Sequence, residues 1–380
     1  MPLLGVFGRR TVRGPLNVRA ISTRVPNGPY DVLFCGTDGF ASTILERLAA
    51  HKELYNTIQV LTPPDAQHSW GGKRMRVSPV KQFAQAYKFP IEHVPAAGMD
   101  QYALPEALRL SSAPLLLTVS FGHMIPQSIL RQFPSASQAL NVHPSLLPQL
   151  RGAAPIQWAI ARQLDMTGVS VQQLAPEHFD TGRILGQVPM SIAEGSTYKS
   201  LADELASLGS ELLVDVIAHL RERDQEAWSQ DAAKATRAPK LKKSVGEVKW
   251  TEWDADKVDA RMRAFGDYVP LMTTLVPAKA SFLPVVVSIR EGASLRGTAQ
   301  GSLAELDAQA HAALRDRPPG SATYSSVLNA MVVRCASSND NAFLATKLQT
   351  QGKPVRNAGD WWLGFHDRSD DDGCIRFAHS

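Results

Sequence analysis

One stretch near the middle of the chain limits the fold more than any other feature. An apolar run ends at Leu140, and an amide and an imidazole, Asn141 and His143, follow within three positions. Pro144 and Pro148 stop a helix from forming across the stretch, because proline lacks a backbone N–H and fixes φ. We therefore expect a buried strand that ends in a loop. Since side chains alternate along a strand, Asn141 and His143 would point to the same face.

An amide donor beside an imidazole can hold the oxyanion that forms when a nucleophile attacks a carbonyl carbon. At an ordinary strand end the same two side chains would only satisfy backbone groups, and an isolated Asn-x-His favours that interpretation. The residues that follow favour the catalytic one. Ser145-Leu146-Leu147-Pro148, then Arg151-Gly152-Ala153-Ala154-Pro155-Ile156, and farther along Asp180-Thr181-Gly182, stand in the order of a known signature. Together with Asn141 and His143 they resemble the folate-dependent formyltransferases.

The resemblance implies an activity, a co-substrate and a set of site residues. Asn141, His143 and Asp180 would be the catalytic set, acting on the formyl carbon of 10-formyltetrahydrofolate without a metal. Asn141 would hold the oxyanion, and Asp180 would keep His143 charged or accept the proton of the attacking amine. Which group is the general base stays open. The folate pocket would be walled by two turns, Phe121-Gly122 and Ser145-Leu146-Leu147-Pro148.

The chain departs from the family pattern at one point. The segment 174–179 is one residue longer than the family usually has before Asp-Thr-Gly, so the way in which Asp180 approaches the site stays open. Arg151 is expected to be structural, anchoring its loop or meeting a carboxylate.

Length and pattern predict two domains, since 380 residues are enough for both. A strand at 31–35, a glycine turn at 36–39 and a helix at 40–50 open a parallel α/β domain. Further helices are expected at 79–87, 104–110, 155–164, 197–223 and 254–264. Further strands are expected at 58–61, 114–120, 168–174 and 184–190, and then at 272–277, 285–289, 327–334 and 342–348.

The resemblance assigns these elements to domains. It implies a Rossmann-like formyltransferase domain over 30–225, a basic linker over 226–247 and an OB-like β-barrel that binds tRNA over 248–366. Residues 291–322, rich in alanine, glycine and serine, look like an insertion into the barrel. Residues 367–380 form an acidic tail that matches nothing in the family pattern.

The positive charge of the chain is concentrated at its start. Residues 1–29 contain five arginines and no acidic residue, which is typical of an organelle transit peptide and predicts the mitochondrial matrix; a disordered basic tail is the alternative. Removing these five charges from the net charge of +4 leaves −1 for residues 31–380. Nucleic-acid binding would therefore depend on local basic patches.

Two such patches are present. A Gly-rich basic loop resembles the loop that enters the acceptor arm of the tRNA in methionyl-tRNA formyltransferases, and such a loop suits phosphates and stacked bases. A solvated surface loop is the alternative. The resemblance thus makes initiator methionyl-tRNA the expected partner, contacted by Lys73, Arg74, Arg76 and Lys81 of the loop and by Lys240, Lys242 and Lys243 of the linker.

Several classes of protein are excluded or disfavoured. No apolar run reaches the ~18 residues of a membrane span. The three cysteines suit neither a metal site nor a disulfide framework and suggest a reducing compartment. We expect a monomer. Two alternatives to the tRNA enzyme stay open: an enzyme that formylates a small amine or hydrolyses formyl-folate, and a catalytically silent RNA-binding relative.

Overall fold

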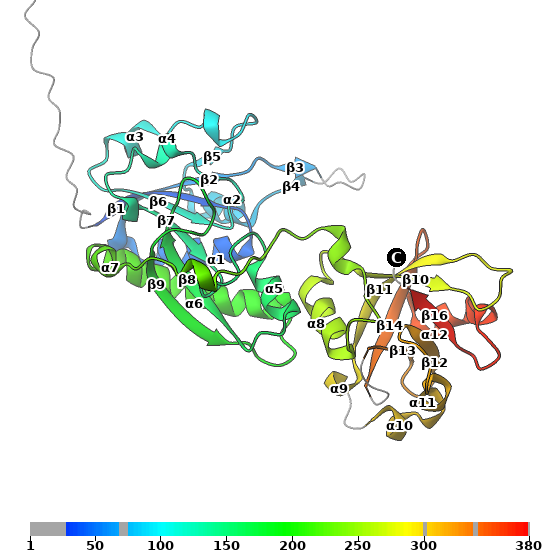
Figure 1. Cartoon of the computed structure of the whole chain (residues 1–380). Coiled ribbons are helices and arrows are strands. Elements are labelled where there is room, and N and C mark those ends of the chain that lie inside the picture. The colour runs from blue at the N-terminus through cyan, green and yellow to red at the C-terminus, as the bar shows by residue number, and fades with distance from the viewer. Residues whose placement is uncertain (1–27, 68–74, 299–301, 337–340, 379–380) are drawn as a thin grey trace, which may run out of the picture.

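A computed structural model describes residues 28–67, 75–298, 302–336 and 341–378. The transit peptide predicted at 1–29 therefore lies almost wholly outside the described residues, as do Lys73 and Arg74 of the basic loop. The described chain forms two lobes joined by a linker, with the N-terminal half in one and the C-terminal part in the other (Figure 1).

The first lobe is built on a seven-stranded sheet with the order β5-β2-β1-β6-β7-β8-β9. The five strands from β5 to β7 are parallel, whereas β8 and β9 run antiparallel at one edge. The strands are β1 (Tyr30–Gly36), β2 (Tyr55–Thr62), β5 (Ile91–His93), β6 (Pro114–Val119), β7 (Ala139–His143), β8 (Met166–Gln173) and β9 (Ile184–Ser191). A short hairpin of β3 (Ala66–Gln67) and β4 (Met75–Arg76), which we did not predict, carries the basic loop.

Both faces of this sheet are covered by helices, as an apolar central strand requires. Side chains of β1 alternate between two cores: Val32 and Phe34 pack with α1 and α6, while Leu33 and Cys35 pack with the residues of α3 and α4. Figure 1 shows these helix pairs on opposite sides of the sheet. The helices are α1 (Gly39–Ala50), α2 (Pro79–Tyr87), α3 (Glu106–Leu110), α4 (Gln127–Leu130), α5 (Pro155–Ala161), α6 (Tyr198–Ala218) and α7 (Leu220–Glu226).

Local signals account for several helix boundaries. Ser78 caps α2 by accepting a hydrogen bond from the Lys81 N–H, and Pro79 occupies the first turn, so the helix predicted at 79–87 is confirmed. Thr197 caps α6 in the same way. The helix expected at 197–223 is wrong as one unit, because it breaks at His219 into α6 and α7.

The second lobe is a closed antiparallel barrel. Its strands follow the order β11-β10-β16-β12-β13-β14, and a direct β11–β14 pairing closes the circle, with β15 attached to β14. The strands are β10 (Leu271–Val276), β11 (Val285–Ser294), β12 (Ser321–Ser325), β13 (Ala330–Arg334), β14 (Ala342–Thr350), β15 (Arg356–Asn357) and β16 (Ile375–Ala378). The predicted fold class, a Rossmann-like domain followed by a small β-barrel, is confirmed.

Two regions of the barrel differ from our expectation. The described residues of the segment 291–322 contain the end of β11, the start of β12 and the helices α9 (Leu295–Thr298), α10 (Leu303–Leu306) and α11 (Ala308–Leu314), which pack on the barrel through Leu295, Leu303 and Leu314. The expected tail supplies β16, which lies between β10 and β12. Phe377 of this strand is only 1% exposed. Residues 375–378 are therefore part of the barrel, and the acidic residues 370–372 just before them hid the strand from sequence reasoning.

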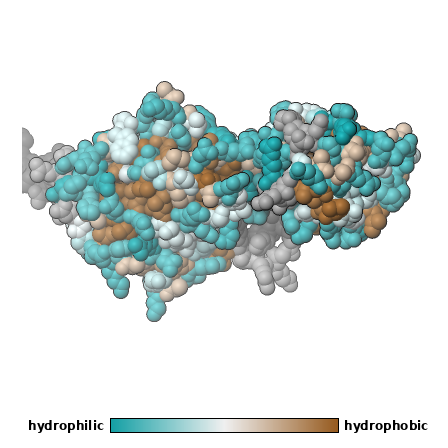
Figure 2. Space-filling view, turned by 90° about the horizontal axis from the view of Figure 1, so that it is seen from below, coloured by the Kyte–Doolittle hydropathy of each residue, from teal (hydrophilic) through white to brown (hydrophobic). Residues whose placement is uncertain are grey.

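The two lobes meet through α8 (Ala255–Phe265), which packs against α5 of the first lobe as well as against β11. Asp254 caps this helix by accepting from the Lys257 N–H. Another helix of the second lobe, α12 (Ala358–Leu363), buries Trp361. Figure 2 shows the face seen from below, where hydrophilic residues predominate and the hydrophobic ones gather mainly on the larger lobe. In the part of the chain that the structure describes, no helix is long and apolar enough to cross a bilayer.

Candidate active site

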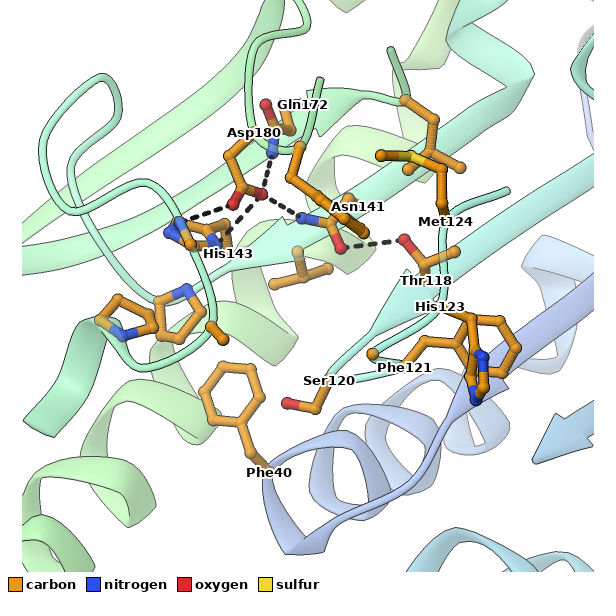
Figure 3. Close-up of a pocket in the computed structure, with 18 of the residues that line it drawn as sticks. Phe40, Thr118, Ser120, Phe121, His123, Met124, Asn141, His143, Gln172 and Asp180 are labelled. Atoms are coloured by element: carbon orange, nitrogen blue, oxygen red, sulfur yellow. Dashed lines mark hydrogen bonds and ion pairs between the residues drawn. The ribbon is translucent and has the colours of Figure 1, made fainter. Parts of the chain in front are cut away.

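A cavity of about 420 Å³ opens at the carboxyl ends of β6 and β7. In an open α/β sheet, the carboxyl ends of the strands are where ligands bind. Its size is within the range of small-molecule sites. Apolar walls come from Phe40, Phe121, Met124, Ile125 and Leu174, and polar groups converge from Thr118, Asn141, His143, Gln172 and Asp180 (Figure 3).

The Asn141 amide has a defined orientation. Thr118, on the neighbouring strand, donates its hydroxyl hydrogen to Asn141 Oδ1 at 2.9 Å. The amide nitrogen therefore faces the other way, toward Asp180 Oδ1, at 3.5 Å. Because that contact is long, the Asn141 N–H groups retain the capacity to donate to a ligand in the cavity.

The His143 ring is fixed by its two nitrogens. Nε2 lies 3.0 Å from the Leu150 carbonyl oxygen, which can only accept, so Nε2 carries a hydrogen. Nδ1 lies 3.4 Å from Asp180 Oδ1. His143 is 5% exposed. Thus Nδ1 is the nitrogen left for proton transfer.

Asp180 is the centre of the polar cluster. Its Oδ1 accepts from Gln172 Nε2 at 2.9 Å, and its Oδ2 accepts from the Gly152 N–H at 2.9 Å (Figure 3). The φ of Asp180 is +59°, a left-handed conformation that costs free energy for a residue other than glycine. Surrounding contacts must therefore hold this turn, and they bring the carboxylate to Asn141 and His143 despite the extra residue before it.

Of the two turns predicted to wall the folate pocket, one lines the cavity and the other does not. Phe121 and Gly122 line the cavity, and Gly122 has a φ of +74° that suits glycine. None of Ser145, Leu146, Leu147 and Pro148 is among the lining residues of the cavity.

These four residues instead support the loop from behind. Ser145 is fully buried and donates to the Gln149 carbonyl at 2.6 Å, and the Leu147 N–H donates to Ser170 Oγ at 3.1 Å. The Pro148 carbonyl accepts from the Thr236 N–H. The prediction that they wall the pocket therefore differs from the structure, because the chain turns away from the cavity after Pro144.

The residues predicted to bind tRNA differ in their surroundings. Lys81 lies in the first turn of α2, where its ammonium pairs with Asp65 Oδ2 at 2.7 Å and is 15% exposed, so it is not a free cation on the loop. Arg76 belongs to β4. Lys240, Lys242 and Lys243 are all exposed on the linker, where the sequence places them.

Sequence reasoning missed several lining residues. Phe40, Ser120, His123, His178 and Phe179 line the cavity but carry no pattern that separates them from ordinary helix or loop residues. A single histidine in a loop, such as His123, is typical of a surface residue, yet its ring packs against Phe121 with centroids 5.1 Å apart. Gln172 was missed because one of two adjacent glutamines on a strand gives no signal.

Asp38 is a further, half-buried acid at the cavity. Its side chain caps α1 by accepting from the Ala41 N–H at 3.0 Å. Burial raises the pKa of its carboxyl, although hydrogen bonds from Ala41 and Ser120 oppose the shift. No group of three or more His, Cys, Asp or Glu residues within the described ranges could hold a metal ion. All three cysteines are buried and free.

Comparison with known proteins gives concordant results. Residues 31–217 match the family described as Formyl transferase. The chain is 32% identical over 329 residues to a methionyl-tRNA formyltransferase of Anaeromyxobacter dehalogenans, a match that covers 87% of this chain and 95% of that relative. It is 31% identical over 263 residues to the mitochondrial methionyl-tRNA formyltransferase of Homo sapiens, a match that covers 68% of this chain and 62% of the human protein. The chain thus spans about three-fifths of the length of the mammalian relatives that it matches.

Solved structures share the fold at low identity. An N-formyltransferase from Helicobacter canadensis, in complex with folinic acid and dTDP-3-aminofucose, superposes with a TM-score of 0.54 at 13% identity and covers 84% of this chain and 99% of its own. A sugar 3-N-formyltransferase determined with dTDP and 5-N-formyl-THF gives a TM-score of 0.55 at 14% identity, with coverage of 86% and 100%. At such identities the likeness shows the fold alone.

Proposed function

We propose that this chain, which belongs to the formyl transferase family alongside relatives named methionyl-tRNA formyltransferase, transfers the formyl group of 10-formyltetrahydrofolate to the amino group of methionyl initiator tRNA. The observation that carries the proposal is the meeting of Asn141, His143 and Asp180 at one end of an apolar cavity. An amide donor, an imidazole and a carboxylate are the groups that attack on a formyl carbon requires.

Each group has one task in this reaction. The acceptor amine attacks the formyl carbon, and the Asn141 N–H donates to the oxygen as its negative charge develops. His143 Nδ1 and Asp180 together take the proton that the amine loses, because their atoms lie 3.4 Å apart and share one cavity wall. The carbon–N10 bond then breaks, N10 takes up a proton, and the formyl group stays on the amine. The reaction needs no oxidant and no metal.

The cavity suits a reduced folate by its shape and lining. Phe121, Met124, Ile125 and Leu174 offer apolar surface to an aromatic ring system, and Phe40 faces them across the cavity. Asn141, His143 and Asp180, the groups that can act on the reacting carbon, gather at one polar end of the cavity, whereas Ser120 and His123 lie beside the apolar residues Phe40 and Phe121. A ligand of this kind is therefore oriented with its reactive nitrogen toward the polar end.

We assign tRNA binding to local cations outside the cavity. Lys240, Lys242 and Lys243 lie on the linker between the lobes, and Arg76 lies on the hairpin at the base of the basic loop. Phosphate contacts of this kind position a nucleic acid without reading its sequence. We propose that residues 30–225 carry the chemistry, while the linker at 226–247 and the barrel from residue 248 hold the tRNA.

One assay tests the activity. The purified chain is mixed with 10-formyltetrahydrofolate and either methionyl initiator tRNA or a small amine such as a sugar nucleotide or glycinamide ribonucleotide. We expect formyl-methionyl-tRNA as the product, with much slower transfer to the small amines. Transfer to a small amine alone, hydrolysis alone, or tRNA binding without transfer would each contradict the proposal and identify the alternative.

We also propose that the enzyme acts in mitochondria, in the matrix, where organellar translation starts. The arginine-rich, acid-free residues 1–29 support this, as do relatives named mitochondrial. Residues 1–29 fused to a fluorescent reporter should direct it into mitochondria, whereas a version with the five arginines changed to glutamine should leave it in the cytosol. A cytosolic signal from the unchanged fusion would contradict the proposal.

A further inference from the structure

The linker between the two lobes is bound along the back of the catalytic loop. Residues 227–239, here called the strap, form bridges with β9 at Trp228 and with the loop at Arg237, whose partner is Arg151. The Ala154 N–H donates to the Ala238 carbonyl at 3.2 Å. The strap is therefore not a free connection: the segment that leads to the barrel also backs the active site.

One strap side chain reaches the catalytic carboxylate loop. Gln230 Nε2 lies 2.8 Å from the Gly182 carbonyl, 3.0 Å from the Asp180 carbonyl and 3.2 Å from Gln172 Oε1. Gln230 Oε1 accepts from Arg151 Nε at 3.0 Å and from Arg151 Nη2 at 2.6 Å. The two ends of this amide thus join the strap to the Asp180 turn and to the loop that follows His143.

The directions of these hydrogen bonds are set by chemistry. The Arg151 guanidinium only donates, so the oxygen of Gln230 must face it and the nitrogen must face the Asp180 turn. That nitrogen in turn requires Gln172 to present its oxygen. The nitrogen of Gln172 is then directed to Asp180 Oδ1, which it meets at 2.9 Å. The orientation of one amide determines the next, from Arg151 to the carboxylate.

The backbone of the turn needs this support. Asp180 has a φ of +59°, which an L-residue adopts only when its surroundings hold it there. At Gly182 a Cβ atom would lie 1.9 Å from the Gln173 carbonyl oxygen, so the turn is already pressed against β8. The Gln230 amide binds the carbonyls on both sides of Thr181, and these are the carbonyls that would swing if the turn relaxed.

From these contacts we infer that Gln230 is a positioning residue, which holds Asp180 in its reactive orientation through Gln172 and through the backbone of the turn. The inference rests on the proposed function for its catalytic meaning. According to this inference, a residue of the linker that leads to the barrel sets the orientation of the Asp180 carboxylate. A shift of the strap on tRNA docking would therefore move Asp180, whereas the Asn141 amide, fixed by Thr118 within the sheet, would stay in place.

The first test replaces Gln230 by alanine and uses Gln225→Ala, an exposed glutamine on α7, as the matched control. We expect Gln230→Ala to lower kcat by about 10- to 100-fold, the scale of a small misplacement in an active site. The Kd values for formyl-folate and tRNA should stay within about twofold of the parent. Gln225→Ala should change neither kcat nor Kd. Unchanged kcat, or equal losses in kcat and both affinities, would overturn the inference.

A second variant keeps the inference testable if Gln230→Ala folds poorly. Gln230→Glu keeps the length of the side chain and its partner Arg151 but cannot donate to the Asp180 and Gly182 carbonyls or to Gln172. It should fold and lose at least as much kcat as the alanine variant. A folded Gln230→Glu variant with parental kcat would overturn the inference.

Two further measurements separate this inference from the proposed function. Hydrogen–deuterium exchange of residues 176–183 should quicken in Gln230→Ala and stay unchanged in Gln225→Ala, whatever substrate the enzyme uses. A parent protein that is inactive on methionyl-tRNA but shows this exchange pattern would refute the function and support the strap; unchanged exchange would refute the strap. In a double-mutant cycle with Gln172→Met, the combined loss of kcat should be smaller than the product of the single losses. Independent, multiplying losses would show that Gln230 does not act through Gln172.

Discussion

The polar contacts of the proposed site in the first lobe differ from those around Trp250 in the barrel core. In the first lobe some contacts of the proposed catalytic residues are long. Asn141 Nδ2 lies 3.5 Å from Asp180 Oδ1, and His143 Nδ1 lies 3.4 Å from the same oxygen. Around Trp250 in the barrel core they are short and complete, since Trp250 Nε1 donates to Thr273 Oγ1 at 2.9 Å and Thr273 donates to the Ala378 carbonyl at 2.8 Å. Closed networks rigidify a core, whereas donors with spare capacity can meet a ligand. The difference fits the proposed division of labour, in which the first lobe carries the chemistry and the barrel holds the tRNA.

The contact between the lobes is itself specific. Arg261 of α8 lies over the rings of Trp253 and Phe265, with its guanidinium carbon 4.2 Å and 5.1 Å from their centroids, and 5.8 Å from that of Trp158 on α5. Burial lowers the pKa of Arg261 to about 10. Because α5 begins at Pro155, which lines the cavity, the helix that receives the barrel also forms a wall of the site.

The largest expected effect concerns the stability of the barrel. Phe377→Ala removes a side chain that is 1% exposed and stacks on Trp250, so it should destabilise the barrel by about 3–5 kcal/mol. Urea unfolding should show the barrel transition shifting while folate binding by the first lobe persists. Leu363→Ala, at a position 72% exposed in the same lobe, is the control and should change stability by less than about 0.5 kcal/mol. Loss of folate binding together with the barrel would show that the lobes do not fold separately.

The next effect is catalytic and confined to the first lobe. Asn141→Ala, His143→Ala and Asp180→Asn should each lower kcat by about 10²-fold or more, the usual cost of losing a group that stabilises the transition state. Folate affinity should stay within a few-fold. Rapid-quench measurement of formyl transfer checks this, and near-parental kcat in any of the three would remove that residue from the catalytic set.

Ser145→Ala tests whether Ser145 supports the loop behind the cavity or binds folate. Since Ser145 donates to the Gln149 carbonyl behind the cavity, its loss should reduce stability by about 1 kcal/mol and leave folate affinity unchanged. Thermal unfolding and folate titration distinguish the outcomes. A marked loss of folate affinity without loss of stability would restore the role that the sequence pattern predicts for this residue.

A smaller effect is expected on the linker. Replacing Lys240, Lys242 and Lys243 with alanine should weaken tRNA binding and flatten the slope of log K against log salt by about 0.7–0.9 for each phosphate that the protein no longer neutralises. The rate of formyl transfer at saturating tRNA should be retained. Replacing Lys52, Lys88 and Arg109 with alanine, three exposed cations of the first lobe away from the linker, is the control for net charge. Equal slopes in both variants would mean that tRNA docks elsewhere.

The smallest effect tests Asp38, the half-buried acid at the cavity. The raised pKa of Asp38 means that the folded protein favours its protonated form. Stability from this group is therefore full below the unfolded pKa of ~3.9 and is lost as pH rises toward the folded pKa. Asp38→Asn can still cap α1 and should be as stable as the parent at a pH below that unfolded value but more stable at neutral pH. Thermal unfolding across this range checks it; a variant less stable at neutral pH would mean that the charge is compensated.

Much of the proposed catalytic site is determined by local sequence. The period of two along β7 puts Asn141 and His143 on one face, two prolines end that strand, and Ser78 with Pro79 starts α2 at the predicted residue. These features depend on neighbours a few positions apart, so the sequence is sufficient. The family resemblance then adds Asp180, which no local pattern would have chosen.

The features that only the tertiary structure decided are contacts between residues far apart in the chain. Strand β16 joins the barrel because its backbone pairs with β10, about a hundred positions earlier, and an acidic local composition says nothing of that pairing. Ser145 is turned away from the cavity by contacts with Ser170. Gln230 reaches Asp180 across fifty positions. Hydrogen-bond partners at such separations are selected by the packing of whole elements, and no periodicity in the sequence encodes them.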